Sequence, residues 1–146
     1  MVAGRDRLNG YRQALEAHRI PVEEDLIVQG DFTETSGLSA VRQLLPLSPS
    51  AVFVANDTMA IGALKAFRQA GLWVPQDVAL VGFDDAPIAL AIEPALTTVR
   101  QPIERLSAIA VEALLSVLAG TSEETTTVHR IILPTELVVR VSYGSA

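Results

Sequence analysis

The sequence predicts an α/β fold with a doubly wound parallel sheet. Two runs, residues 51–55 and 78–83, are almost wholly apolar and have the length of strands. Continuous apolar runs are typical of parallel strands that are covered on both faces, whereas strands with one wet face alternate. Helical patterns lie before, between and after these runs, and this alternation is the order of a layered α/β domain.

The first third of the chain gives two helices and one short strand. Apolar residues recur at helical spacing over Arg5–His18, which predicts the first helix. A short strand is expected at Leu26–Val28. Thr33 is a good N-cap for the second helix, and Pro46 ends it. Because such a layer normally begins with a strand, we interpret residues 1–4 as a remnant of one.

Capping residues, glycines and prolines predict where the remaining helices and strands begin and end. Asp57 is expected to cap a third helix, with Gly71 just beyond its end. Leu96–Arg100 is expected to be extended, and Pro102 suits the first position of a strongly apolar helix over Ile103–Ala119. The rest of the chain is expected to form a surface loop at Thr121–Thr127 and extended segments at Ile131–Leu133 and Glu136–Val141.

Charge and composition exclude several classes of protein. The net charge is −6, and the 11 basic residues are scattered among 17 acidic ones, so the chain has no basic surface with which to bind DNA by itself. The absence of cysteine fits a reducing cytoplasm. The apolar runs are too short to cross a bilayer, and the first residues do not have the pattern of a signal peptide.

No cofactor or metal site is expected. His18 and His129 have no partners at metal-ligand spacing. Asp84 and Asp85 could in principle hold Mg²⁺ in an enzyme or phospho-acceptor, but such sites need further carboxylates and usually a nearby lysine. The sole lysine, Lys65, lies in the middle of a predicted helix. We therefore expect a protein that is not an enzyme.

Polar residues stand where the predicted strands end, which is where open parallel sheets bind ligands. These are Asp31 with Phe32, Asn56 with Asp57, and Asp84 with Asp85. Carboxylates accept hydrogen bonds from hydroxyls, an amide both donates and accepts, and a ring covers the C–H face of a sugar, so the set suits a polyol. Arg7 would add a fork of donors. Taken singly, each residue has a plainer role as a cap, a core residue or a solvated helix residue.

Together, in order and spacing, these segments resemble the lactose/galactose repressor (LacI/GalR) family over nearly the whole chain, from about Arg5 to Val141. The matching segments are Arg5-Asp6-Arg7-Leu8-Asn9-Gly10-Tyr11, Gly30-Asp31-Phe32 with Ser36-Gly37, Ala55-Asn56-Asp57-Thr58-Met59-Ala60-Ile61-Gly62, Val74-Pro75-Gln76-Asp77-Val78, Val81-Gly82-Phe83-Asp84-Asp85 and Leu96-Thr97-Thr98-Val99-Arg100-Gln101-Pro102.

The resemblance implies an organisation like that of a type I periplasmic binding protein, with two α/β subdomains joined by crossing strands. Residues 1–99 would form most of the C-terminal subdomain, with its first strand largely missing. Residues 100–128 would cross over and supply a helix to the N-terminal subdomain, and residues 129–146 would return. The helix-turn-helix headpiece that binds DNA in this family has no counterpart in the sequence.

The resemblance also implies a function and a site. The chain would be the sugar- or nucleoside-sensing part of a cytoplasmic, homodimeric repressor, in which the effector closes the two subdomains and changes DNA binding. The effector residues carried over from the family are Arg7, Phe32, Asn56, Asp84 and Gln101. A sugar-binding protein of a transport system would have the same fold, and remains the alternative.

Overall fold

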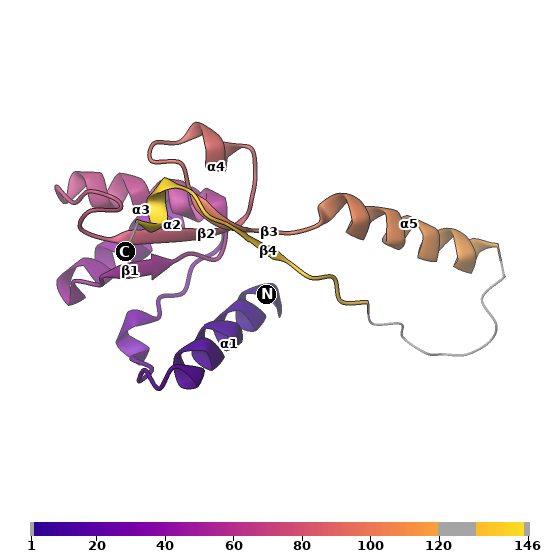
Figure 1. Ribbon diagram of the computed structural model, residues 1–146, viewed down its shortest axis with the longest axis horizontal. Coiled ribbons are helices and arrows are strands. Elements are labelled where there is room, and N and C mark those ends of the chain that lie inside the picture. The colour runs from indigo at the N-terminus through magenta and orange to yellow at the C-terminus, as the bar shows by residue number, and fades with distance from the viewer. Residues whose placement is uncertain (1, 120–130, 145–146) are drawn as a thin grey trace.

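The computed structural model describes residues 2–119 and 131–144 and confirms the α/β fold. Four strands form one sheet in the order β1-β2-β3-β4 (Figure 1). The strands β1 (Ala51–Phe53), β2 (Ala79–Asp84) and β3 (Thr97–Arg100) are parallel, and β4 (Glu136–Val138) pairs with β3 in the antiparallel direction. The predicted strands at 51–55 and 78–83 and the extended segment at 96–100 are therefore confirmed, with small shifts of their ends.

Helices α2 (Glu34–Leu44) and α3 (Asp57–Gln69) pack against each other and against the sheet. Thr33 caps α2 as predicted, because its Oγ1 accepts a hydrogen bond of 3.1 Å from the Ser36 backbone N–H. Gly71 has a φ of 76° just past the end of α3, where a glycine was expected. The most deeply buried apolar residues are Val41, Ala60, Ala63, Ala66, Phe67, Val78, Leu80, Ala89 and Leu96.

Two predictions about the start of the chain are wrong. Helix α1 (Val2–Ala17) confirms the first helix but begins earlier than expected, so residues 2–4 are helical and not the remnant of a strand. Leu26–Val28 is not a strand, since Glu24–Leu26 forms a 3-10 turn and the residues after it join no sheet. β1 is the edge strand, and both β1 and residues 26–30 line a cavity of about 570 Å³. A strand needs a paired neighbour, and the described residues offer Leu26–Val28 none.

The end of the described chain is fastened to the sheet by an element that the sequence pattern did not predict. A 3-10 turn, Val141–Tyr143, follows β4. Within it the buried Ser142 donates from Oγ to the Leu80 carbonyl over 2.6 Å and accepts from the Thr97 N–H over 2.8 Å. Short helices α4 (Ile88–Ala91) and Leu45–Leu47 were also unexpected, and Ile131–Leu133 joins no strand.

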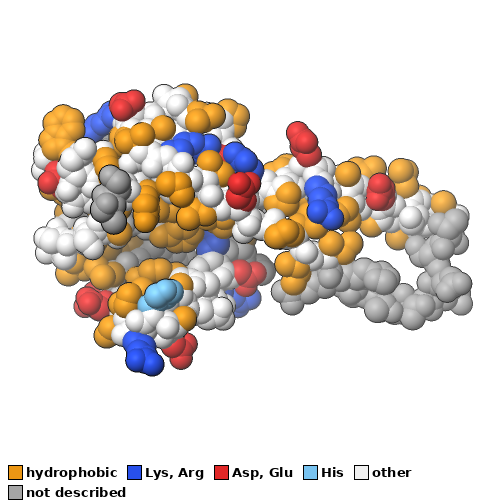
Figure 2. All heavy atoms as spheres, viewed as in Figure 1, with side chains coloured by type: hydrophobic (Ala, Val, Ile, Leu, Met, Phe, Trp, Pro, Cys, Tyr) orange, Lys and Arg blue, Asp and Glu red, His pale blue; other side chains and the backbone are white. Residues whose placement is uncertain are grey.

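Helix α5 (Ile103–Leu118) confirms the last predicted helix and projects away from the rest of the molecule (Figure 1). Pro102 precedes it as the N-cap residue, one position earlier than expected. No residue of α5 is buried, and Figure 2 shows apolar side chains along its length. A contiguous exposed apolar surface usually marks a contact site. Its large exposed apolar residues are Ile103, Leu106, Val111, Leu114, Leu115, Val117 and Leu118.

Residues 120–130, which include Gly120, the predicted loop Thr121–Thr127 and His129, lie outside the described part of the chain. Among the described residues, no helix is both long enough and apolar enough to span a membrane.

Candidate functional site

The ends of β2 and β3 bring two predicted ligand residues into contact. Asp84 is the last residue of β2, and Gln101 follows the last residue of β3. The two strands are parallel and pair Asp84 with Arg100, so their carboxyl ends meet at one edge of the sheet. The Gln101 Nε2 amide donates to Asp84 Oδ1 over 2.7 Å. A carboxylate and an amide thus lie side by side at the sheet end where ligands are expected.

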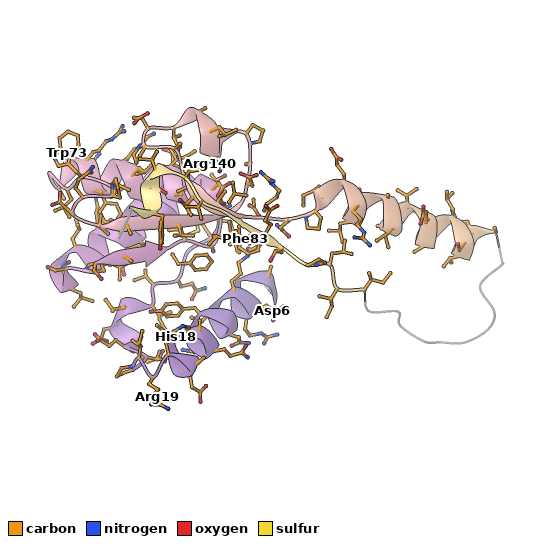
Figure 3. All side chains as sticks on the ribbon, viewed as in Figure 1. Asp6, His18, Arg19, Trp73, Phe83 and Arg140 are labelled. Carbon is orange, nitrogen blue, oxygen red and sulfur yellow. The ribbon has the colours of Figure 1, made fainter. Side chains whose placement is uncertain are left out.

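Arg7 reaches the same place from α1. Its Nη2 lies 3.8 Å from Asp84 Oδ1, and its side chain is 16% exposed, so it is not an ordinary solvated helix residue. The guanidinium carbon lies 3.9 Å from the centroid of the Phe83 ring and 5.8 Å from that of Phe32. In Figure 3, Phe83 lies between the sheet and α1. The faces of aromatic rings attract a cation and so help to hold the Arg7 donors in place.

Phe32 and Asn56 are joined to each other next to this group. Phe32 has a left-handed backbone with a φ of 69°, and its carbonyl accepts from Asn56 Nδ2 over 3.1 Å. Asn56 Oδ1 accepts from the Met59 N–H over 2.9 Å, so Asn56 is the N-cap of α3. The prediction that Asp57 caps this helix is wrong, because Asp57 is already its first residue. One hydrogen of Asn56 Nδ2 remains for a further acceptor.

Asp57 instead lies buried beneath the site. Its side chain accepts from Thr98 Oγ1 over 2.6 Å and from the Ala86 N–H over 2.8 Å. Burial raises the pKa of Asp57, although these two hydrogen bonds act in the opposite direction. Gly82 makes room for the carboxylate, since a Cβ there would lie 2.4 Å from Asp57 Oδ1. Asp57 therefore links the start of α3 to β3 and to the turn that follows β2.

Asp85 turns away from Asp84 and binds two arginines. Its Oδ2 accepts from Arg100 Nε over 2.6 Å, and its Oδ1 accepts from Arg140 Nη2 over 2.5 Å. Burial alone would raise the pKa of Asp85, but the hydrogen bonds and charges of the two arginines outweigh burial and lower it. Asp85 is thus an ionised anchor and does not share a ligand with Asp84.

The end of β2, with the turn that follows it, has a strained backbone at both carboxylates. The φ angles are 117° at Asp84 and 55° at Asp85. Residues other than glycine adopt such angles at a cost of about 1–3 kcal/mol each, and they cluster at functional sites where the surrounding contacts hold them. Here the surrounding contacts are the bonds of Asp57, Arg100 and Arg140 to this turn.

The third predicted polar group has a local role. Asp31 Oδ1 accepts from the Thr33 N–H over 3.0 Å and from Thr33 Oγ1 over 2.6 Å. These bonds, together with one that involves Ser36, lower the pKa of Asp31 to about 2. Asp31 therefore shapes the turn that presents Phe32.

The two acidic neighbours bind separate sets of partners. Within residues 2–119 and 131–144, no group of three His, Asp or Glu side chains is arranged to hold a metal ion. Asp84 and Asp85 each face positively charged or amide groups instead of a shared space. Lys65 lies elsewhere and pairs with Glu34 on the surface of α2 and α3, with Nζ 2.5 Å from Oε1.

Sequence reasoning missed several residues that build this site. Phe83, Thr98 and Arg100 lay within the segments that resemble the family but were given no role in the site, and Arg140 was given none either. One available signal was the position of Phe83 directly before the acidic pair, at the carboxyl end of a strand. No local signal links Arg140 to Asp85, because 55 residues separate them.

Comparison with known proteins decides the family. Residues 2–143 match the periplasmic binding protein-like domain family. The chain belongs to this family. Its relatives are LacI-type transcriptional regulators, so the resemblance found in the sequence is confirmed. The chain is 44% identical over 144 residues to the transcriptional regulator CelR of Thermobifida fusca. It is 41% identical over 131 residues to the ribose operon repressor of Escherichia coli strain K12.

The fold of this family member agrees with a solved relative. The structure of a CelR–cellobiose complex superposes with a TM-score of 0.91 at 42% identity, covering 97% of this chain and 43% of that one. The alignment with the T. fusca regulator includes 97% of this chain and 42% of the regulator. The alignment with the E. coli repressor includes 88% of this chain and 36% of the repressor. The chain thus spans about two fifths of the length of these curated relatives, within their effector-binding domain. The two curated relatives and the solved structure are named as regulators or repressors of transcription.

Proposed function

We propose that this family member is the effector-sensing part of a transcriptional repressor, and that the effector is a small sugar or a nucleoside. The proposal depends on the convergence of Arg7, Asp84 and Gln101 at one sheet end, beside the rings of Phe32 and Phe83. Asp84 can accept hydrogen bonds from hydroxyls, Arg7 and Gln101 can donate, and a ring can cover the apolar face of a sugar. The cellobiose complex of CelR and the name of the ribose operon repressor support a sugar.

The proposed domain organisation gives the exposed helix a partner. We place residues 1–99 in the C-terminal subdomain, residues 100–128 in the crossover and the N-terminal subdomain, and residues 129–146 in the return segment. The complete absence of buried residues in α5 supports this division, because a helix so apolar is stabilised by packing against another surface. The second subdomain would also complete the pocket above Asp84.

The mechanism follows from differential binding. A sugar that contacts both subdomains binds the closed form more tightly than the open form, and it shifts the equilibrium only by that difference. Closure would reposition DNA-binding headpieces in a cytoplasmic homodimer. Because linkage is reciprocal, DNA would change sugar affinity by the same factor. This function involves binding alone and requires no catalysis, metal or cofactor.

The test is an anisotropy titration of the whole protein with labelled DNA from upstream of its own gene. Cellobiose and ribose are the first probes, followed by a panel of sugars and nucleosides. We expect one probe to change DNA affinity by about tenfold or more, which lies within the usual range of allosteric coupling. A sugar that binds tightly but leaves DNA affinity unchanged would contradict the regulatory function and favour a carrier.

A control variant separates an effect at the candidate site from the mere loss of one negative charge. Asp25 is exposed and lies in the 3-10 turn after α1, away from the sheet end. Asp25→Asn has the same change of charge as a substitution in the site, and it should leave both the DNA affinity and its response to the sugar unaltered.

A further inference from the structure

Two neighbouring carboxylates bind two neighbouring residues at the exit of β3. Asp84 accepts from the side chain of Gln101, with 2.7 Å between Oδ1 and Nε2. Asp85 accepts from the side chain of Arg100, with 2.6 Å between Oδ2 and Nε. The first contact belongs to the candidate sugar site, and the second belongs to the strand that leads into α5.

Asp85 also holds the strand that returns. Arg140 follows β4, and its side chain donates to Asp85 from Nη2 and to the Leu96 carbonyl from Nη1 over 2.7 Å. The Arg140 backbone N–H donates to Thr97 Oγ1 over 2.8 Å. The Asp85 and Arg140 side chains are 10% and 11% exposed, so this ion pair is shielded from solvent. Figure 3 places Arg140 at the sheet, close to where β3 and β4 run side by side.

These contacts make one carboxylate the junction of three segments, namely the turn after β2, the end of β3 and the segment after β4. The end of β3 leads into α5, and β4, which follows residues 131–135, leads to Arg140 and the 3-10 turn after it. Asp84 and Asp85 are consecutive, and both have positive φ angles that the surrounding contacts must hold. A displacement of either strand that moves Asp85 therefore also moves Asp84.

We propose that Asp85 is a positioning residue that couples the sugar contact of Asp84 to the two strands running to and from α5. The role of Asp84 in this proposal rests on the function proposed above. When a sugar binds Asp84, the Asp85 ion pairs transmit the change to Arg100 and Arg140. When the strands move with the second subdomain, the same ion pairs move Asp84.

The test uses NMR of the 15N-labelled chain without any sugar, so its outcome does not depend on whether an effector binds. In Asp85→Asn, we expect amide hydrogen exchange at Arg140 and Ser142 to accelerate about tenfold or more, because a buried charge pair is lost. We also expect the side-chain amide signals of Gln101 to shift. A role confined to holding β4 would leave the Gln101 signals in place.

The reciprocal variant is the sharper half of the experiment. Asp84→Asn should accelerate exchange at Arg140 about threefold, although the described hydrogen bonds and ion pairs of Asp84 go to Gln101 and Arg7 and not to Arg140, since coupling acts in both directions. If Asp85→Asn does not fold, Arg100→Gln takes its place, because it removes one partner of Asp85 at a half-exposed position. Arg100→Gln should shift the Gln101 signals and accelerate exchange at Arg140 in the same way, but more weakly. Asp25→Asn is the control and should alter none of these signals.

Unchanged Gln101 signals in Asp85→Asn, or unchanged exchange at Arg140 in Asp84→Asn, would overturn the coupling. If the coupling is found but no sugar or nucleoside changes DNA affinity, then the proposed function fails while the connection between the two carboxylates stands.

Discussion

Replacing Gly62 with alanine should lower the free energy of unfolding by about 3 kcal/mol or more, at the upper end of what overpacking costs. A Cβ at Gly62 would lie 1.9 Å from the Glu34 carbonyl oxygen and 2.7 Å from the Leu38 nitrogen. Both neighbours are backbone atoms of α2, so no side-chain rotation relieves the clash. Gly37 has the reciprocal contact, with Met59 O at 2.1 Å from its Cβ position. The two helices touch backbone to backbone and would have to separate.

Gly10→Ala is the matched control, and urea unfolding followed by circular dichroism is the measurement. Gly10 lies within α1, and a Cβ there would meet nothing within 4 Å. Alanine in an open helical position should be neutral or stabilise the chain by up to about 1 kcal/mol. If Gly62→Ala unfolds at the same urea concentration as Gly10→Ala, the close packing of α2 on α3 is wrong.

Asp57→Ala should destabilise the chain by about 2–4 kcal/mol, since it leaves buried hydrogen-bond donors without an acceptor. The affected donors are Thr98 Oγ1 and the Ala86 N–H, and the lost carboxylate also connects α3 with β3 and with the turn after β2. Asp57→Asn retains one carbonyl oxygen and should cost less than alanine. Asp25→Ala, at an exposed position, should stay within about 0.5 kcal/mol of the unaltered chain. Equal unfolding midpoints for Asp57→Ala and Asp25→Ala would contradict the buried role.

The raised pKa of the Asp57 carboxyl should appear in how the free energy of unfolding depends on pH. Burial raises its pKa above the ordinary value of 3.8, so the folded chain takes up this proton at a higher pH than the unfolded chain does. Its contribution to the free energy of unfolding should therefore increase as the pH falls through the raised value toward 3.8, and stay level below that. The measured quantity is the difference between the unaltered chain and Asp57→Asn. A difference that shrinks on acidification in this range would show that the pKa is lowered instead.

The sequence predicted the elements that depend on local pattern. Thr33 was recognised as a cap because a hydroxyl stood before an apolar helical stripe, and β2 was recognised from its continuous apolar run. The cap of α3 was misassigned by one residue, since Asn56 and Asp57 are both good capping residues. Which of them enters the core depends on Thr98, which lies 41 residues further along the chain.

The failures concern pairing between distant segments. Leu26–Val28 has the composition of a strand, but whether it forms one depends on a neighbour that its own sequence does not encode. By contrast, the resemblance placed Asp84 and Gln101 in one site, and the Gln101 amide nitrogen lies 2.7 Å from the Asp84 carboxylate. The separate role of Asp85 could not be predicted, because it follows from where Arg140 lies after β4 has returned to the sheet.

The most direct test of the central claim is a calorimetric titration of the whole protein and its Asp84→Ala variant with the sugar or nucleoside that changes DNA affinity. Asp6→Ala is the control, since Asp6 is an exposed carboxylate on α1. The account predicts that Asp84→Ala weakens binding about 10- to 100-fold, the usual effect of losing a hydrogen bond to a charged group. It also predicts that Asp6→Ala binds normally. Unchanged affinity in Asp84→Ala, with the fold intact, would contradict the proposal that the sheet end at β2 and β3 binds the effector.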